Sequence, residues 1–178
     1  RIVGSDFEIE VTDMKFQTGT YVHLGTLTKG SANDAIIEAM QLSTIEAIVN
    51  SDRRWDIMRN HTATHLAHAA LRKVVGTHVK QSGSYVGPDR LRFDFSHHQP
   101  MTHEQIEEVE QIVNEEIIKG TPVKTDIMPV DEAKKSGAMA LFGEKYGDTV
   151  RVVSVEAFSR ELCGGTHVEN VGQIGPFI

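Results

Sequence analysis

Two short segments, far apart in the chain, carry side chains of the types that bind metal ions. Residues 59–73, RNHTATHLAHAALRK, place His61 and His65 four positions apart. On an α-helix these positions lie one above the other, so both imidazoles can reach one point. Cys163 and His167 have the same spacing in CGGTH, where two glycines let the backbone turn tightly. Three imidazoles and one thiolate favour zinc, so the sequence predicts one zinc site built from both segments.

The neighbours of these residues limit the chemistry of such a site. A zinc protease of the HExxH type needs a glutamate beside its first histidine as general base, and Thr62 occupies that position. Peptide hydrolysis by that route is therefore excluded. Four protein ligands also make a closed structural site, whereas catalytic sites keep a position open for water or substrate. Three interpretations stay open: one ligand is loose, the metal expands its shell, or the metal shapes a pocket without activating the nucleophile.

Other histidines have less specific surroundings. His68 lies on the same helical stripe as His65 and could compete for the metal, but we expect it at the surface or at the edge of the core. His97, His98 and His103 lie beside a proline-containing loop, where solvated histidines are the usual case.

The first 55 residues read as strands. FEIEV alternates Phe7, Ile9 and Val11 with glutamates, TYVHLGTL leads into the turn-like KGSAND, and STIEAIV places apolar residues on one face. These strands predict a small antiparallel sheet or partial barrel. The charged segment NSDRR, residues 50–54, is the expected boundary, so we predict a β-barrel-like subdomain at 1–55 and a second domain at 56–178.

The second domain mixes helices and strands. A helical pattern runs from about residue 57 to Val75, RLRFDF alternates as a half-buried strand, and Thr102 with Gln105 forms a capping box for a helix that ends at Gly120. A strand at 122–129, a short helix at 131–137 and a strand at 149–155 follow. Because strands and helices do not alternate strictly, the prediction is an α+β domain with a mixed or antiparallel sheet and packed helices.

Composition sets the broad class of protein. The chain has 178 residues, a net charge of −7 and a single cysteine, and no apolar run approaches the ~20 residues that cross a bilayer. One cysteine excludes an internal disulfide and suits a reducing compartment, so the cytoplasm is the expected location. The acidic balance argues against non-specific binding of nucleic acid, and any RNA contact is expected to be local. The first residue is Arg1 and not methionine, which we interpret as a sign that the chain is part of a longer protein.

Several long motifs together resemble the editing domain of the alanyl-tRNA synthetase family. They are RNHTATHLAHAALRKVVGTHVKQSGSYVGPDRLRFDFSH, GAMALFGEKYGDTVRVV and SRELCGGTHV, in the family's order. The first 50 residues resemble the small β-barrel that precedes this domain. Free-standing alanyl-tRNA editing proteins are related, and the editing domain of threonyl-tRNA synthetase shares the HxxxH and CxxxH arrangement. ALFGEKYGD and LRFDFSH favour the alanine enzyme.

The resemblance implies a function, proofreading hydrolysis of tRNA(Ala) wrongly charged with serine or glycine, with no charging of tRNA by this chain alone. Its zinc ligands correspond to the same four residues that the spacing selects. Thr62 matches the threonine associated with the serine hydroxyl, and Gln81 matches a glutamine that lines the editing pocket. Gly164 and Gly165 match the close-packed glycines beside the metal, where backbone N–H groups could stabilise an oxyanion.

The resemblance also implies partners and leaves alternatives. The partners are the acceptor end of mischarged tRNA(Ala) and the rest of the synthetase chain, with no membrane. Arg92 and Asp94 could form a structural ion pair as readily as contact substrate, and Cys163 could act as a covalent nucleophile only if it were not committed to zinc. The competing hypothesis is a module that binds the tRNA acceptor end through a purely structural zinc and has no hydrolytic activity of its own.

Overall fold

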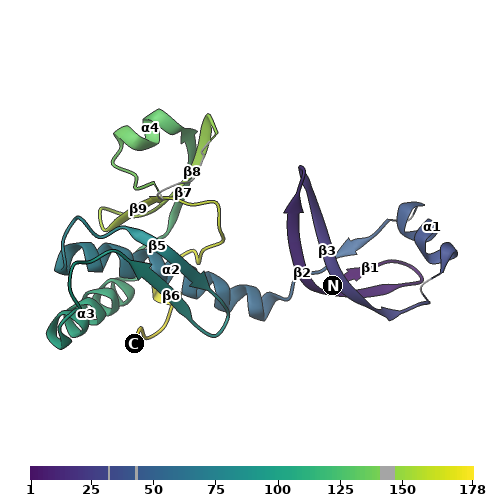
Figure 1. Ribbon diagram of the computed structural model, residues 1–178, viewed down its shortest axis with the longest axis horizontal. Coiled ribbons are helices and arrows are strands. Elements are labelled where there is room, and N and C mark those ends of the chain that lie inside the picture. The colour runs from purple at the N-terminus through teal and green to yellow at the C-terminus, as the bar shows by residue number, and fades with distance from the viewer. Residues whose placement is uncertain (32, 43, 141–146) are drawn as a thin grey trace. The chain divides into compact units, whose positions relative to one another are not determined.

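The structure is a computed structural model that describes the chain except residues 32, 43 and 141–146. Contacts divide the chain into two compact units, Arg1–Ser51 and Asp52–Ile178, and each is described in turn (Figure 1). Helices and antiparallel sheets both occur, which confirms the predicted α+β class. Most of the motif ALFGEKYGD lies outside the described residues.

The first unit is an antiparallel sheet with one helix. Its strands are β1 (Ile2–Val3), β2 (Glu8–Gln17), β3 (Thr20–Lys29) and β4 (Glu46–Ala47), in the order β3-β2-β1-β4. The tight turn between β2 and β3 places Thr18 and Gly19 at φ 47° and 83°, as a two-residue hairpin loop requires. The predicted antiparallel sheet is confirmed, but the described residues form no closed barrel.

Helix α1 (Asp34–Leu42) lies where only strands and a turn are predicted. Ile36, Ile37 and Met40 recur at helical spacing, and the Asn33 side chain accepts a hydrogen bond from the Ile36 N–H at 3.0 Å, which caps the helix. The prediction of strands throughout this unit is wrong here, because the helical spacing of these apolar residues outweighs the neighbouring turn residues.

Helix α2 (Ser51–Val74) is the central element of the second unit. It begins at Ser51, six residues before the predicted start, because the charged segment taken as a boundary forms its exposed first turns, with Asp52 at the positive end of the helix dipole. Its buried face consists mainly of small residues and leucines. The apolar residues of this buried face are Ala63, Leu66, Ala67, Ala70 and Leu71.

A hairpin and a second helix enclose this core. Strands β5 (Gln81–Val86) and β6 (Leu91–Phe95) pair antiparallel, and α3 (His103–Lys119) buries Val109, Val113 and Ile117 in the same cluster as α2. The Thr102–Gln105 capping box is present, and Gly120 ends α3 at φ 63°, which confirms both predicted ends of this helix. Strand β5 was not predicted, because its sequence, QSGSYV, shows no alternation of apolar and polar residues.

The remaining sheet carries one of the two segments of interest. Strands β7 (Lys124–Pro129), β8 (Thr149–Val155) and β9 (Ser159–Leu162) form an antiparallel sheet in that order, and α4 (Val130–Lys135) packs against it. The predicted strands at 122–129 and 149–155 and the predicted short helix are confirmed. Cys163 follows β9 directly, and the chain then runs through the short 3-10 helix η1 (Val171–Gln173) to the core of α2 and α3.

Candidate metal centre

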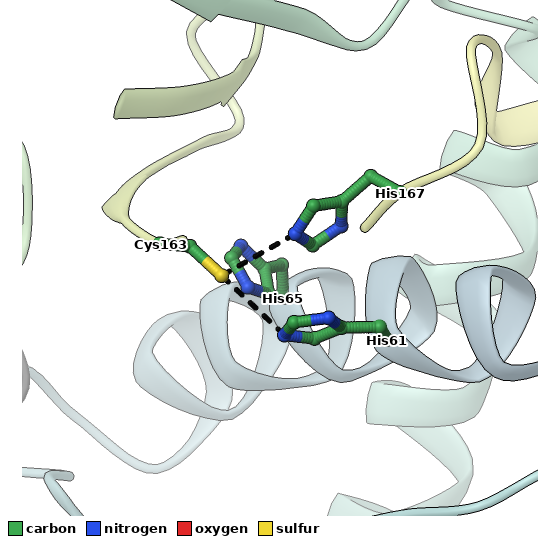
Figure 2. Close-up of side chains that lie close together, drawn as sticks. All are labelled: His61, His65, Cys163 and His167. Atoms are coloured by element: carbon green, nitrogen blue, oxygen red, sulfur yellow. Dashed lines mark hydrogen bonds between the residues drawn. The ribbon is translucent and has the colours of Figure 1, made fainter. Parts of the chain in front are cut away.

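Four side chains from the two distant segments converge on one point. Helix α2 supplies His61 and His65, and the segment after β9 supplies Cys163 and His167 (Figure 2). The Cys163 Sγ lies 3.4 Å from Nε2 of His61 and 3.4 Å from Nε2 of His167. One donor atom from each of the four residues lies within 4.8 Å of the others. The predicted convergence of both pairs is therefore found.

The two sulfur–nitrogen distances match the spacing of ligand atoms around a tetrahedral metal. Bonds of about 2.0–2.1 Å to nitrogen and about 2.3 Å to sulfur put neighbouring ligand atoms roughly 3.3–3.8 Å apart. The two sulfur–nitrogen distances fall in this range before any adjustment of the side chains. The residues present can hold a metal ion, and a donor set of three imidazole nitrogens and one thiolate sulfur suits zinc.

Burial keeps the imidazoles ready to bind a cation. It is the main cause that lowers the pKa of His61 to about 4 and that of His167 to about 2, with the neighbouring histidines adding to the effect. Burial also lowers the pKa of His65, against an opposing influence of Glu161. All three rings are therefore neutral near pH 7, so no proton has to leave them when a metal binds.

Thr62 contacts His167 on the side of the ring that faces away from the other metal-binding candidates. Its side chain is 1% exposed, and its hydroxyl donates to the Met58 carbonyl at 2.9 Å and accepts from the Val168 N–H at 3.2 Å. The same oxygen lies 3.1 Å from Nδ1 of His167. Because the hydroxyl proton is used at Met58, His167 donates from Nδ1 and keeps Nε2 as the metal-facing nitrogen. Recognition of a substrate hydroxyl by Thr62 stays a prediction, and it would require one of these bonds to break.

The two glycines differ in what surrounds them. A β-carbon on Gly165 would lie 2.6 Å from Nδ1 of His61, whereas one on Gly164 would meet nothing within 4 Å. The Gly165 N–H points to the Cys163 sulfur at 3.4 Å, and Arg151 donates to the Cys163 carbonyl at 3.0 Å and to the Gly165 carbonyl. Close approach is thus needed at Gly165, and its N–H is directed at the Cys163 sulfur. A role for either N–H in an oxyanion hole stays a prediction.

A buried carboxylate that the sequence analysis missed lies behind the histidines. Glu161, in β9, is 5% exposed and places Oε1 3.0 Å from Nδ1 of His68 and Oε2 3.7 Å from Nδ1 of His65. His68 is 2% exposed, so its expected place at the surface or core edge is wrong. In an extended chain Glu161 shares a face with Cys163, two residues on, and that period-two relation is the signal that could have revealed it.

Gln81 lines a separate hollow of about 300 Å³ together with His68 and Arg72, and none of the four metal-binding candidates is among its lining residues. Its amide donates to the Ser84 hydroxyl at 3.3 Å. Arg92 and Asp94 form an exposed ion pair of 3.1 Å, in agreement with the structural interpretation of these two residues.

Comparisons with known proteins agree with these motifs. The chain is 54% identical over 177 residues to alanine–tRNA ligase 1 of Lachnoclostridium phytofermentans, and 51% identical over 177 residues to alanine–tRNA ligase of Staphylococcus aureus strains JH9 and Newman. In each case the match covers 99% of this chain and 19% of the relative. These relatives are named as alanine–tRNA ligases.

A family model described as the threonyl and alanyl tRNA synthetase second additional domain matches residues 150–178, the part that contains Cys163 and His167. The resemblance to the alanyl-tRNA synthetase editing region is thereby confirmed. The chain spans about a fifth of the length of the alanine–tRNA ligases it matches. Among the helices that the structure describes, we find none with the length and apolar character needed to cross a membrane.

Proposed function

We propose that this chain is the editing domain of an alanine–tRNA ligase and hydrolyses the ester bond of tRNA(Ala) mischarged with serine or glycine. The observation that carries the proposal is the convergence of His61, His65, Cys163 and His167, from two segments of an alanine–tRNA ligase-like sequence, into one cluster of three nitrogen donors and one sulfur donor. Such a donor set is well suited to zinc, which we propose as its cofactor.

A bound zinc ion would supply positive charge that holds the aminoacyl end or a water molecule and favours the charge that develops on the ester oxygen. The protein's own groups would keep the zinc ion and its ligands in place. Thr62 fixes the ring of His167, the Glu161 carboxylate lies behind His65, and Arg151 holds the backbone carbonyls of the CGG segment. With rotation of these side chains restricted, the donor atoms need little reorganisation when a substrate arrives.

Editing answers a problem of selectivity. A small pocket built for alanine cannot strongly reject serine, because one added hydroxyl changes binding by only a few kcal/mol, so a second hydrolytic site is needed. The proposed partners follow: the acceptor end of mischarged tRNA(Ala), and the rest of the ligase chain, which would supply most contacts to tRNA because this chain carries a net charge of −7. We propose the cytoplasm as its location.

A second candidate function rests on the ligand count. Four protein donors fill a tetrahedral metal, as in structural zinc sites, so the chain could present the tRNA acceptor end without cleaving it. This module would bind tRNA and release no amino acid.

A deacylation assay separates the two functions. Zinc-loaded chain is mixed with Ser-tRNA(Ala), Gly-tRNA(Ala) and Ala-tRNA(Ala), and release of the amino acid is followed for the wild type, for Cys163→Ala and after chelation of the metal. We expect release of serine and glycine that Cys163→Ala and chelation abolish, with Ala-tRNA(Ala) spared. Equal rates on all three tRNAs would overturn the proofreading function, and tight binding without release would favour the binding module.

A further inference from the structure

We propose that His78, His97 and His98 form a second metal site, which binds a divalent transition-metal ion of tetragonal geometry, Ni²⁺ or Cu²⁺. The three residues lie in the turn after α2 and in the segment after β6. Nε2 of His78 lies only 2.9 Å from Nδ1 of His97, so two nitrogens that can bind a metal already meet at the surface. This site shares no residue with the four-residue cluster beside α2, and it does not depend on the proposed function.

One arginine fixes the backbone on both sides of His78. Arg72, in the last turn of α2, donates to the Thr77 carbonyl at 2.6 Å and to the Val79 carbonyl at 2.8 Å. The Val79 side chain is fully buried in the core cluster of α2 and α3, which anchors the turn. Because the peptide groups before and after His78 are held in this way, its imidazole starts from a defined position.

His97 is held beside the same turn by the backbone. The N–H of Ser96, the residue before His97, donates to the Lys80 carbonyl at 3.1 Å, next to the paired strands β5 and β6. Gly76, at φ 131°, leaves room for the His78 ring, since a β-carbon there would lie 2.8 Å from its Nδ1. The fold therefore places the two exposed rings together, and their meeting does not depend on long, mobile side chains.

The separation of the two nitrogens fits neighbouring ligands of a tetragonal metal. Two metal–nitrogen bonds of about 2.05 Å at a right angle put their nitrogens about 2.9 Å apart, whereas the tetrahedral angle puts them about 3.3 Å apart. The same 2.9 Å is the length of the hydrogen bond that His78 and His97 make without a metal. That bond keeps the two nitrogens at ligand spacing, so an ion that replaces the shared proton needs little movement of the rings.

Binding of the ion requires a lone pair on both nitrogens. A neutral imidazole has one nitrogen that carries a proton and one that accepts, so one ring of the hydrogen-bonded pair donates and the other accepts. When the metal binds, the donating ring moves its proton through solvent to its second nitrogen, and neutral rings release no net proton. Imidazole is a ligand that suits both Ni²⁺ and Cu²⁺, and Cu²⁺ should bind more tightly.

His98 supplies the third ligand. Its ring stacks on that of His78, with 5.4 Å between the centroids and 19° between the planes. The side chain is exposed, so it can rotate about its two side-chain bonds and turn a nitrogen toward the pair. Water would occupy the remaining positions around the ion.

Calorimetry with Ni²⁺ tests the site in the full chain after zinc has been added to the four-residue cluster. At pH 8, where an ordinary histidine is neutral, the wild type should bind one equivalent of Ni²⁺ without releasing zinc. His78→Gln and His97→Gln should each weaken this binding at least about 10-fold, since each removes a ligand. His98→Gln should weaken it too. His103→Gln, which removes an exposed histidine beside Glu107, is the matched control and should bind Ni²⁺ as the wild type does.

Electron paramagnetic resonance with one equivalent of Cu²⁺ gives a readout that does not depend on heat. The zinc-loaded wild type should show the axial spectrum of a tetragonal ion with splitting from nitrogen ligands, and His78→Gln should lose that splitting. Circular dichroism and zinc content establish that each variant is folded. Unchanged Ni²⁺ affinity in His78→Gln and His97→Gln, an equal loss in His103→Gln, or a wild-type spectrum without nitrogen splitting would overturn the site. Unchanged affinity in His98→Gln would refute the three-histidine ligand set.

Discussion

Replacing Thr62 with valine should weaken the metal centre although no ligand is touched. Valine keeps the shape of threonine and removes the hydroxyl. Two buried donors then lose their acceptor: Nδ1 of His167, at 3.1 Å, and the backbone N–H of Val168, at 3.2 Å. Each unpaired buried donor costs about 1–3 kcal/mol, so the folded state should lose about 2–6 kcal/mol. The His167 ring also loses the contact that selects its tautomer, which should lower zinc affinity about 10- to 100-fold.

A neighbouring threonine provides the matched control. Thr64 is 5% exposed, lies on the same helix and donates to the Asn60 carbonyl at 2.8 Å, in the same way that Thr62 donates to Met58. Thr64→Val removes a donor from a carbonyl that also accepts the helix bond, so it leaves no buried donor unpaired. Its cost should stay below about 1 kcal/mol, and Thr62→Ser, which keeps the oxygen, should retain most of the zinc affinity.

Two measurements test this reasoning. Competition with a chromophoric chelator at pH 7 gives the zinc affinity of each variant, and urea unfolding of the metal-free chain gives its free energy of unfolding. If Thr62→Val bound zinc as tightly as Thr64→Val and unfolded at the same urea concentration, the hydroxyl would have no role in orienting His167.

Further predictions concern the glycines and the pH dependence of stability. Gly165→Ala should lower zinc affinity at least about 10-fold in the same chelator competition, because its β-carbon would meet the His61 ring. Gly164→Ala has open space around it and should change the affinity less than about 2-fold. Equal effects of the two substitutions would show that the close approach at Gly165 is unimportant. Burial lowers the pKa of His61 to about 4 and that of His167 to about 2. Below pH 6.5, the ordinary pKa of histidine, these rings therefore bind protons in the unfolded metal-free chain but stay neutral in the folded chain. The stability of the metal-free chain should therefore be complete above pH 6.5 and fall as the pH drops, by up to about 2 kcal/mol per ring at pH 5, which urea unfolding at pH 7.5, 6 and 5 measures; a flat profile would contradict the burial of neutral rings.

The candidate metal centre could be predicted from the sequence to the extent that its geometry is local. His61 and His65 share a helix face at a spacing that any α-helix fixes, and Cys163 and His167 repeat that spacing around two glycines. For Glu161 the sequence holds only the period-two relation to Cys163, because its contact with His65 depends on the pairing of β9 with β8, which brings it to the buried face of α2.

The fold shows the same division between local and long-range information. Helix α3 is specified at both ends by the Thr102–Gln105 box and by Gly120, and the structure contains all of these features. Strand β5 forms because the β6 backbone lies beside it, from Gln81 opposite Phe95 to Val86 opposite Leu91, and its own sequence shows no apolar alternation. The open sheet of the first unit likewise depends on strand order, which local periodicity does not encode.

The surroundings of Thr62 differ from those of the catalytic glutamate in a metalloprotease, and not only its residue type. The Thr62 side chain reaches back to the Met58 carbonyl and inward to Val168, and it is 1% exposed. A glutamate in that place would bury its carboxylate between the helix and the Val168 backbone, with no access to water beside the metal. The first residue after His61 therefore supports the position of His167, and a general base that activates water would have to come from another residue.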